Sequence, residues 1–391
     1  MPKYPRFSSI INSILESIYE KYSTKIAYHG SNLIKFHYGD THFQPKYLLP
    51  INPEFIRKNP EFNRYCDSFG VNELREALVE KLKNDNMFPV SKKNVMITNS
   101  GTNALSLSTI GLVEPDEDVI VITPVWSFVF EIMSFCGANV IEVPLYVKLY
   151  EDPEIDINLH MKQFVTKKTV AIYLNTPNNP SGKVLNLKQL EQISKFAREH
   201  KLWIISDEAY EGLIYDNNIH HSIGSLSGLF DQTISIFTFS KLYQFAGIRL
   251  GYVVGAKEVI QNLNKIMMHQ IYSPTTLGQM MMVEPVRTRN EWKEIVKLEY
   301  QKLRDYFVQN LEFQFNVPEA TFYFFFSIKK YLKERNYDEI IETLLDNAVF
   351  VALGKEFGKD FNDYIRICFT IEPIEKQKKG IEVLNSIILN S

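Results

Sequence analysis

The chain has 391 residues, of which 45% are apolar and 23% charged, and its 43 Lys and Arg against 46 Asp and Glu give a formal charge of −3. This composition is typical of a globular protein with a large core and excludes a disordered polyelectrolyte, and at roughly 150 residues per domain the length indicates two to three domains. The near-neutral balance lacks the basic excess of a protein that binds nucleic acid or an anionic membrane, so a small-molecule enzyme is the leading class.

At the N-terminus, a helix is predicted from about Ser8 to Tyr22, followed by a loop around Gly39. The first residues lack the apolar segment of a signal peptide, and no run approaches the roughly 18 apolar residues of a membrane-spanning helix. The three cysteines, Cys66, Cys136 and Cys368, are widely separated and favour neither a disulfide framework nor a zinc cluster. We expect a cytoplasmic protein with reduced cysteines, no metal site and no membrane partner.

From about Asn94, short β-branched runs alternate with longer helical stretches, which is the pattern of βα units that build a parallel sheet. These runs show little polar alternation, so helices should cover both faces of the sheet. The prediction is a large α/β domain over residues 46–287 with a mostly parallel seven-stranded sheet. Its strands are expected at Val95–Ile97, Asp118–Ile122, Asn139–Val143, Val170–Leu174, Trp203–Ile205, Ile234–Phe237 and Gly251–Val254.

After about Arg287 the pattern changes to α+β. Residues 288–391 are expected to join residues 1–45, which precede the first βα unit, in a smaller domain formed by both chain ends. The aromatic run Phe322–Phe326 is interpreted as a buried strand rather than a recognition surface. The predicted elements are helices at Glu291–Gln309, Asp338–Asp346 and Ile374–Leu389, and strands at Thr321–Ser327, Val349–Val351 and Tyr364–Phe369.

Two polar motifs follow the first and the fourth of the predicted strands. The segment Asn99–Ala104, with sequence Asn-Ser-Gly-Thr-Asn-Ala, opens a helix whose N-terminal N–H groups could bind phosphate. The turn cluster Asn175–Gly182 follows the strand Val170–Leu174. Taken alone, the first is an ordinary helix cap and the second is only turn chemistry.

Two further motifs follow later strands. Asp207, in Ser-Asp-Glu-Ala-Tyr, lies at the carboxyl end of a parallel strand, where open α/β sheets build ligand sites, although alone it would be a helix cap. Lys241, in Thr-Phe-Ser-Lys, lies between two apolar strands with Arg249 eight residues later. Burial there would lower the pKa of the Lys241 ammonium and favour an amine that forms a Schiff base, rather than a surface cation pair. All four motifs fall at carboxyl ends of predicted parallel strands.

Four segments together resemble the aspartate-aminotransferase-like family. They are the turn cluster Asn175–Gly182, the Asp-Glu-Ala-Tyr segment that ends at Tyr210, the Ser-Lys pair at Lys241 and the Gly-Ile-Arg-Leu-Gly-Tyr segment around Arg249. These class I/II enzymes have fold type I and use pyridoxal 5′-phosphate (PLP). The resemblance extends from about Tyr38 to Arg366. It implies PLP as cofactor, an amino acid and a 2-oxo acid as substrates, and a homodimer with shared active sites.

The resemblance also implies roles for single residues around the PLP ring. Lys241 matches the lysine that holds PLP as a Schiff base and then moves a proton between Cα and C4′. Asp207 matches the carboxylate that keeps the pyridine nitrogen protonated, so that the ring stays an electron sink. Tyr210 and Asn179 match the donors to the phenolic oxygen O3′, and Trp126 matches the aromatic residue that stacks on the ring.

The two anionic groups, the cofactor phosphate and the substrate carboxylate, have implied binding residues as well. Arg366 matches the small-domain arginine that pairs with the substrate α-carboxylate, and an Arg on an apolar strand is costly without such an anion. Gly39, together with Asn179, is expected beside the same carboxylate. Tyr65 matches a tyrosine that reaches the phosphate of the neighbouring subunit. The phosphate itself is expected to be bound by Ser100, Gly101, Thr102, Thr238, Ser240 and Arg249.

The chain departs from the family pattern near the expected substrate entrance. The segment Gly39–Pro45 lacks the early proline that is common there, and Leu353 precedes Gly354 where proline is usual. These departures leave the cofactor assignment intact and the substrate open. Tyr38, His42 and His269 are candidates for side-chain specificity, and each could instead have a packing or surface role.

Transamination, in which an amino acid gives its amino group to PLP and a 2-oxo acid collects it, is the predicted activity. The alternative is a β- or γ-elimination, replacement or cyclisation of a modified amino acid, as in enzymes resembling capreomycidine synthase. Both share a quinonoid intermediate, so cofactor motifs do not separate them. A non-catalytic regulator is a third hypothesis, but the helix Ser8–Tyr22 is too small for a DNA-binding domain and the complete lysine, aspartate and arginine set favours catalysis.

Overall fold

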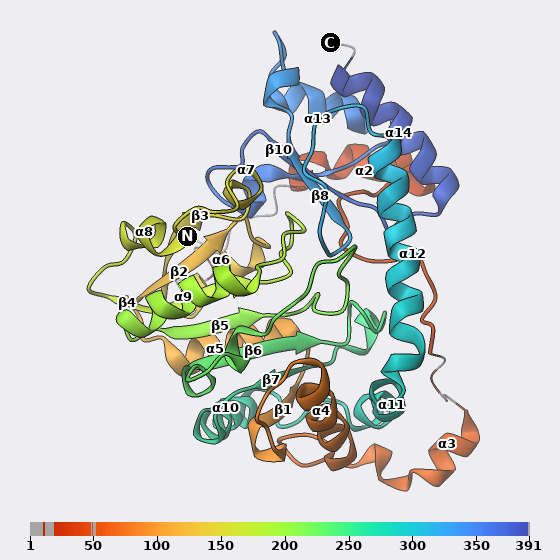
Figure 1. The fold of residues 1–391 in the computed structure, drawn as a ribbon. Coiled ribbons are helices and arrows are strands. Elements are labelled where there is room, and N and C mark those ends of the chain that lie inside the picture. Colours follow the sequence, from red (N-terminus) through yellow and green to blue (C-terminus); the bar gives the residue numbers. More distant parts are fainter. Residues whose placement is uncertain (1–10, 12–18, 48, 50–51, 390–391) are drawn as a thin grey trace, which may run out of the picture.

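The computed structural model describes residue 11 and residues 19–47, 49 and 52–389 (Figure 1). Most of the helix predicted over Ser8–Tyr22 lies outside these residues. Within them, a 3₁₀ turn at Glu20–Tyr22 continues into α2 (Ser23–His29), so the prediction ends the helical region too early. The physical reason is packing, because Tyr22 and Ile26, one helical turn apart, both contact the main hydrophobic core.

A seven-stranded sheet lies at the centre of the molecule in the order β1-β7-β6-β5-β4-β2-β3. All seven predicted strands are confirmed, and β7 alone runs antiparallel to its neighbours β1 and β6. The remaining pairs are parallel. The strands are β1 (Val95–Thr98), β2 (Asp118–Thr123), β3 (Asn139–Pro144), β4 (Thr169–Asn175), β5 (Trp203–Asp207), β6 (Thr233–Thr238) and β7 (Gly251–Val254).

Helices cover both faces of this sheet, as the largely apolar strands predict (Figure 1). Along β2, Val119 and Val121 pack toward one face, and Ile120 and Ile122 pack toward the other. The first face is covered by α5 (Gly101–Leu112), α6 (Phe128–Phe135) and α10 (Lys257–Gln270). The second is covered by α7 (Lys148–Glu151), α8 (Ile157–Lys162) and α9 (Leu187–Glu199), with α4 (Asn72–Asp85) beside β1 and β7.

A second, three-stranded antiparallel sheet has the order β8-β10-β9 and consists of β8 (Tyr323–Ser327), β9 (Ala352–Leu353) and β10 (Tyr364–Cys368). Figure 1 shows α12 (Arg289–Asn310) running from α11 (Thr276–Arg287) up to this sheet, with α13 (Tyr337–Asp346) and α14 (Ile374–Leu389) beyond it. The remaining helix, α3 (Pro53–Lys58), lies at the opposite end of the molecule.

Two of the predicted strand positions around the small sheet are corrected by the structure. The strand predicted at Val349–Val351 is displaced, because the backbone there pairs with the N-terminal segment, where Phe350 N–H donates to the carbonyl of Ile34 at 3.0 Å. The ladder with β10 begins only at Ala352. Similarly, β8 starts at Tyr323 rather than Thr321, since Thr321 has a left-handed φ of 68° that no regular strand accepts.

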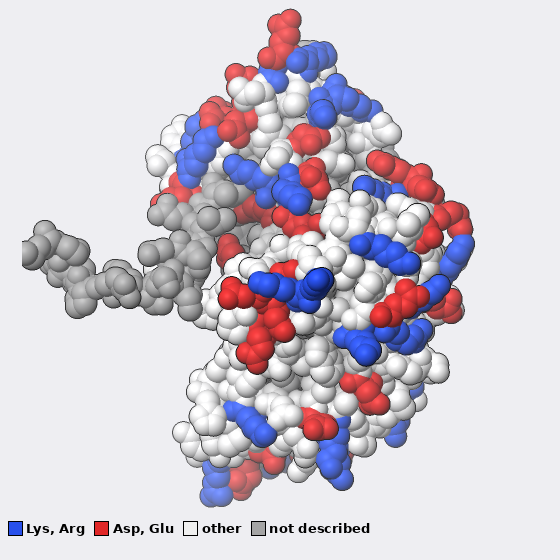
Figure 2. All heavy atoms as spheres, turned by 90° about the vertical axis from the view of Figure 1, so that its left-hand side faces the viewer, with Lys and Arg blue, Asp and Glu red and all other residues white. Residues whose placement is uncertain are grey.

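On the face drawn in Figure 2, Lys and Arg lie interspersed with Asp and Glu. This agrees with the formal charge of −3. Across the described ranges, every helix is too short or too polar to traverse a bilayer.

Candidate active site

The carboxyl ends of β4, β5 and β6, the N-terminus of α5 and the small sheet enclose a cavity of about 270 Å³. The cavity brings together residues that the sequence spreads over more than three hundred positions. Of the predicted site residues, those that line it are Gly39, Ser100, Gly101, Thr102, Trp126, Asn179, Asp207, Tyr210, Thr238, Ser240, Lys241, Arg249 and Arg366. Tyr65 does not line it; its side chain is 84% exposed and its ring contacts Tyr272 edge-on.

Lys241 projects into this cavity from the connection that follows β6. Its Nζ donates a hydrogen bond to the Gly39 carbonyl at 2.9 Å and lies 5.3 Å from the centre of the Phe322 ring. Burial lowers the pKa of the Lys241 ammonium to about 8, and the negative charge of Asp40 partly offsets that effect. Near pH 8, Lys241 is therefore a neutral, nucleophilic amine in a substantial fraction of the molecules.

Asp207 is the last residue of β5, and its carboxylate is held by two donors. The Tyr173 hydroxyl donates to Oδ2 at 2.8 Å, and the Ala209 N–H donates to Oδ1 at 3.0 Å. Burial raises the pKa of Asp207, whereas the hydrogen bond from Tyr173, the backbone N–H and the charge of Lys241 lower it. These contacts fix the orientation of the carboxylate and favour its ionised form.

One end of the cavity is suited to an anion. Ser100, with a φ of 92°, caps α5, so the first N–H groups of this helix face the cavity edge. The Thr238 hydroxyl donates to Ser240 Oγ at 2.9 Å, and Arg249, which has a φ of 59°, lies two residues before the start of β7. A Cβ at Gly251 would lie 2.8 Å from the Gly101 nitrogen, so only glycine allows β7 to approach the helix start this closely. Hydroxyls, N–H groups and a guanidinium therefore converge here.

Arg366 provides a second anion-binding group on β10, at the small-sheet side of the cavity. Its Nη1 donates to Asn179 Oδ1 at 3.0 Å and its Nη2 to the His37 carbonyl at 2.7 Å. The guanidinium is buried and forms no ion pair with a carboxylate of the described chain, and its Nε lacks a hydrogen-bond partner there. A buried cation without a counter-ion favours binding of an anionic ligand.

Two aromatic side chains complete the cavity. The Tyr210 hydroxyl lies 3.0 Å from the Tyr323 hydroxyl. The Trp126 ring stacks on Phe128, with ring centres 4.8 Å apart and planes inclined by 19°. Tyr210 and Trp126 therefore each contribute an aromatic ring to the cavity, and Tyr210 also contributes a hydroxyl that can form hydrogen bonds.

Comparison with known proteins identifies the family. Residues 31–382 match the family described as Aminotransferase class I and II. The chain belongs to this family. This aminotransferase is 32% identical over 332 residues to an aspartate aminotransferase of Pyrococcus abyssi, with 83% of this chain and 84% of the relative covered. It is 30% identical over 352 residues to aromatic-amino-acid aminotransferase 2 of Thermococcus litoralis, with 88% of each chain covered.

A solved structure of an aromatic aminotransferase from Pyrococcus horikoshii OT3 superposes with a TM-score of 0.82 at 28% identity, covering 94% of this chain and 98% of that one. The predicted fold class, PLP as cofactor and the assignment as an aminotransferase are thereby confirmed. The comparisons support transamination over the alternative of elimination or cyclisation.

The residues of the cavity fit PLP in kind. A phosphate needs the hydroxyls, helix N–H groups and guanidinium found at one end, and a protonated pyridine nitrogen needs a carboxylate such as Asp207. An aldehyde needs a neutral amine, and the pKa of Lys241, lowered to about 8 by burial, provides one. These three groups lie around one cavity of the aminotransferase.

Sequence reasoning missed several side chains that matter in this geometry. Asn175 lines the cavity, donates to the Asp207 carbonyl at 3.0 Å and accepts the Asn179 N–H at 2.7 Å, so it joins two of the motifs. Tyr173 and Tyr323 lie in strands that were predicted only as buried apolar segments. Hydrophobic patterns do not distinguish a tyrosine whose hydroxyl reaches a site from one in the core, so no sequence signal identified them.

The three candidates for side-chain specificity lie outside the cavity lining. Tyr38 is 60% exposed. His42 Nδ1 lies 2.7 Å from the Thr370 carbonyl oxygen, which fixes the segment after Gly39. His269 Nδ1 lies 2.8 Å from the Lys265 carbonyl oxygen on its own helix. A packing role suits His42, and a surface role suits the other two.

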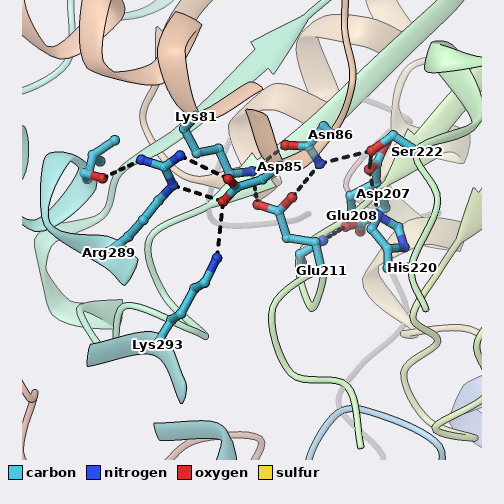
Figure 3. Close-up of polar contacts among 12 residues, drawn as sticks. Lys81, Asp85, Asn86, Asp207, Glu208, Glu211, His220, Ser222, Arg289 and Lys293 are labelled. Atoms are coloured by element: carbon cyan, nitrogen blue, oxygen red, sulfur yellow. Dashed lines mark hydrogen bonds and ion pairs between the residues drawn. The ribbon is translucent and has the colours of Figure 1, made fainter. Parts of the chain in front are cut away.

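A buried polar network adjoins Asp207 without lining the cavity (Figure 3). Its centre is Glu208, which lies 2.8 Å from His220 Nε2. Glu208, Glu211 and His220 offer ligand atoms within 4.8 Å of one another, a spacing that could hold a metal ion. However, the Lys81 ammonium donates to Glu211. The protein thus supplies its own cation at this place.

The same network ties α4 to two other parts of the chain (Figure 3). Asn86, at the end of α4, donates to Ser222 Oγ at 2.9 Å, and Asp85 accepts hydrogen bonds from Arg289 Nε at 2.8 Å and Nη2 at 2.9 Å. The loop that begins at Asp207 and the start of α12 are therefore anchored to one helix.

Proposed function

We propose that this aminotransferase moves an amino group between an L-amino acid and a 2-oxo acid, with Lys241 as the residue that bonds the cofactor. The observation that carries the proposal is the lysine amine, with a pKa lowered to about 8, in a cavity that also contains Asp207 and Arg366. Bound PLP would supply an electron-withdrawing ring that stabilises negative charge at the substrate Cα. Every other task falls to side chains of this chain.

The cofactor-binding residues that we propose are those of the cavity floor and its anionic end. Asp207 would hold a proton on the pyridine nitrogen, and Tyr173 supports this by keeping the carboxylate ionised. Tyr210 and Asn179 would donate to the phenolic oxygen, and Trp126 would pack against the ring. The phosphate would be bound by Ser100, Gly101, Thr102, Thr238, Ser240 and Arg249.

Substrate binding would be the task of Arg366 with Gly39 and Asn179. The planar guanidinium can pair with both oxygens of an α-carboxylate, and its position is already fixed by Asn179 and the His37 carbonyl. Binding the carboxylate and the amino group at two points determines which Cα bond is broken. Lys241 Nζ would then take the proton from Cα as a general base.

At the level of the whole molecule we propose a large domain over residues 46–287 and a small substrate-clamping domain over residues 1–45 and 288–391. We further propose a cytoplasmic homodimer with shared active sites, in which Tyr65 reaches the phosphate of the neighbouring subunit. The 84% exposure of Tyr65 supports this role, because such a side chain is available to a second copy. The free cysteines, Cys66, Cys136 and Cys368, support a reducing compartment.

The test is a screen of the purified PLP-loaded enzyme against the common and several hydroxylated amino acids. A substrate should convert the bound cofactor to its pyridoxamine form and release the matching 2-oxo acid, and addition of a second 2-oxo acid should restore the starting spectrum. Sustained product formation with no transfer of the amine would contradict transamination. Tritium or deuterium exchange at Cα would report proton removal independently of turnover.

A further inference from the structure

Tyr323, the first residue of β8, lies between the two ends of the proposed site. Its hydroxyl is 3.0 Å from the Tyr210 hydroxyl, and the Arg366 guanidinium carbon lies 4.3 Å from the centre of its ring. It also borders Gly39, where an added Cβ would fall within van der Waals overlap of the Tyr323 hydroxyl. One side chain thus contacts Tyr210, a proposed cofactor ligand, and two of the three residues proposed to bind the carboxylate, Arg366 and Gly39.

The hydrogen bond between the two tyrosines can run in either direction, because each hydroxyl can donate or accept. The proposed role of Tyr210 determines which direction holds when the cofactor is bound. A phenol has one proton, so if Tyr210 donates its proton to the phenolic oxygen of PLP, only Tyr323 can donate between the two tyrosines. In that arrangement Tyr323 donates and Tyr210 accepts.

This direction determines what Tyr210 can do. A hydroxyl that accepts a hydrogen bond keeps its own proton free for another acceptor. Tyr210 lines the cavity, and there its proton would be directed at an oxygen of the bound cofactor. Hydrogen bonds in such a chain also strengthen one another.

The Tyr323 ring has a separate effect on Arg366. A guanidinium at 4.3 Å from a ring centre is within the range of a cation–π contact, and the Phe357 ring lies 4.9 Å from the same guanidinium carbon. Both rings restrict the guanidinium to one plane while Asn179 and His37 hold its Nη atoms. The ring therefore positions Arg366 for a carboxylate, and the hydroxyl is not needed for this.

We propose that Tyr323 is a positioning residue that acts on both ends of the site: its hydroxyl directs the proton of Tyr210 toward the phenolic oxygen of PLP, and its ring aligns Arg366 for the substrate carboxylate. This inference rests on the proposed function, because it assumes the roles of Tyr210 and Arg366 given above.

The hydroxyl is tested with Tyr323→Phe, which keeps the ring. The measurements are the dissociation constant for PLP and the pH titration of the absorbance of bound PLP without substrate. We expect PLP to bind about three- to tenfold more weakly, as for the loss of one hydrogen bond. We expect the titration midpoint to move to higher pH, because a donor to the phenolic oxygen stabilises the deprotonated form. An unchanged midpoint, or one at lower pH, overturns the role of the hydroxyl.

Two further variants make this test specific. Tyr252→Phe is the matched control, since the Tyr252 hydroxyl is buried on β7 and has no partner in the described chain; it should behave like the wild type. In a Tyr210→Phe background, Tyr323→Phe should have no further effect on the titration, because the hydroxyl acts through Tyr210. Additive effects of the two substitutions would contradict the proposed relay.

The ring is tested by comparing Tyr323→Leu with Tyr323→Phe. We expect the Leu variant to have a KM for the amino acid about three- to tenfold above that of the Phe variant, with similar kcat. Equal KM values in two folded variants would overturn the role of the ring. If the wild-type protein takes up no PLP, the proposed function fails. If the wild-type protein takes up PLP and the Tyr323 variants cannot be distinguished from it, the proposed function stands and only this inference fails.

Discussion

The two ends of the cavity are built in different ways. At the end formed by the seven-stranded sheet, Asp207 is the last residue of β5, and Lys241 and the start of the Ser100–Thr102 segment come within three residues of the ends of β6 and β1, so a strand fixes the backbone at or near each functional group. At the end formed by the small sheet, Arg366 is positioned by Asn179 and His37, which are 187 and 329 positions away. The first end depends on local geometry and the second on long-range contacts. We therefore expect the chemistry of the first end to tolerate change in the second, whereas substrate binding should not.

The largest effect is expected from removing the amine at the sheet end. Lys241→Ala should lower kcat by at least about 10³-fold, because covalent attachment and proton transfer both depend on Nζ. Borohydride should no longer fix PLP to the protein, which mass spectrometry would show. Lys195→Ala is the control, since the Lys195 side chain is 69% exposed and its ammonium pairs with Glu199 on the same helix, α9. Turnover at the wild-type rate in Lys241→Ala would contradict the proposed catalytic role.

The complementary change is made at the small-sheet end. Arg366→Ala should raise the KM for the amino acid about ten- to a hundredfold, through loss of a charged bidentate contact, while PLP binding stays close to that of the wild type. Arg366→Lys should recover only part of the loss, because an ammonium keeps the positive charge but cannot donate two parallel hydrogen bonds to a carboxylate as the planar guanidinium does. Steady-state kinetics and a PLP titration on both variants would separate the two ends. A KM insensitive to Arg366→Ala would place the carboxylate elsewhere.

The third prediction concerns pH and the sheet end alone. Because the neutral amine is the reactive form and the pKa of Lys241 is lowered to about 8, the rate of PLP uptake by the apoenzyme should rise with pH and level off above that value. Between pH 7 and pH 9 the increase should be about tenfold, as the neutral fraction grows from roughly a tenth to nine tenths. A rate that still climbs steeply at pH 9 would indicate an ordinary lysine pKa.

The smallest effect is expected next to Asp207. Tyr173→Phe removes the donor to Oδ2, and since that donor lowers the pKa of Asp207, the pKa of the carboxyl should rise in the variant. Activity would then be lost at a higher pH as the solution is acidified, and kcat at pH 8 should fall by about threefold. Tyr243→Phe is the control, because the Tyr243 hydroxyl is buried without a partner in the described chain. If activity falls at the same pH in both variants as the solution is acidified, the contribution of Tyr173 is ruled out.

The contrast between the ends also explains how far the sequence could predict the site. Residues such as Asp207 and Lys241 stand beside apolar strand patterns, so their meeting at one sheet edge follows from topology. Arg366 was predicted from the resemblance and from the cost of a cation on an apolar strand. Tyr323 and Tyr173 could not be predicted, because a strand pattern says which side chains are buried but not where a buried hydroxyl finds its partner.

The reversed direction of β7 has a further consequence. Since β7 returns antiparallel to β6, the connection from Phe239 to Leu250 starts and ends at the same edge of the sheet, and it carries both Lys241 and Arg249. Lys241, which would bond the cofactor, and Arg249, which would bind its phosphate, thus belong to one short connection between two adjacent strands. A shift of this connection would move Lys241 and Arg249 together, so the amine would keep its position relative to the residue proposed to bind the phosphate, whether or not it is bonded to the cofactor.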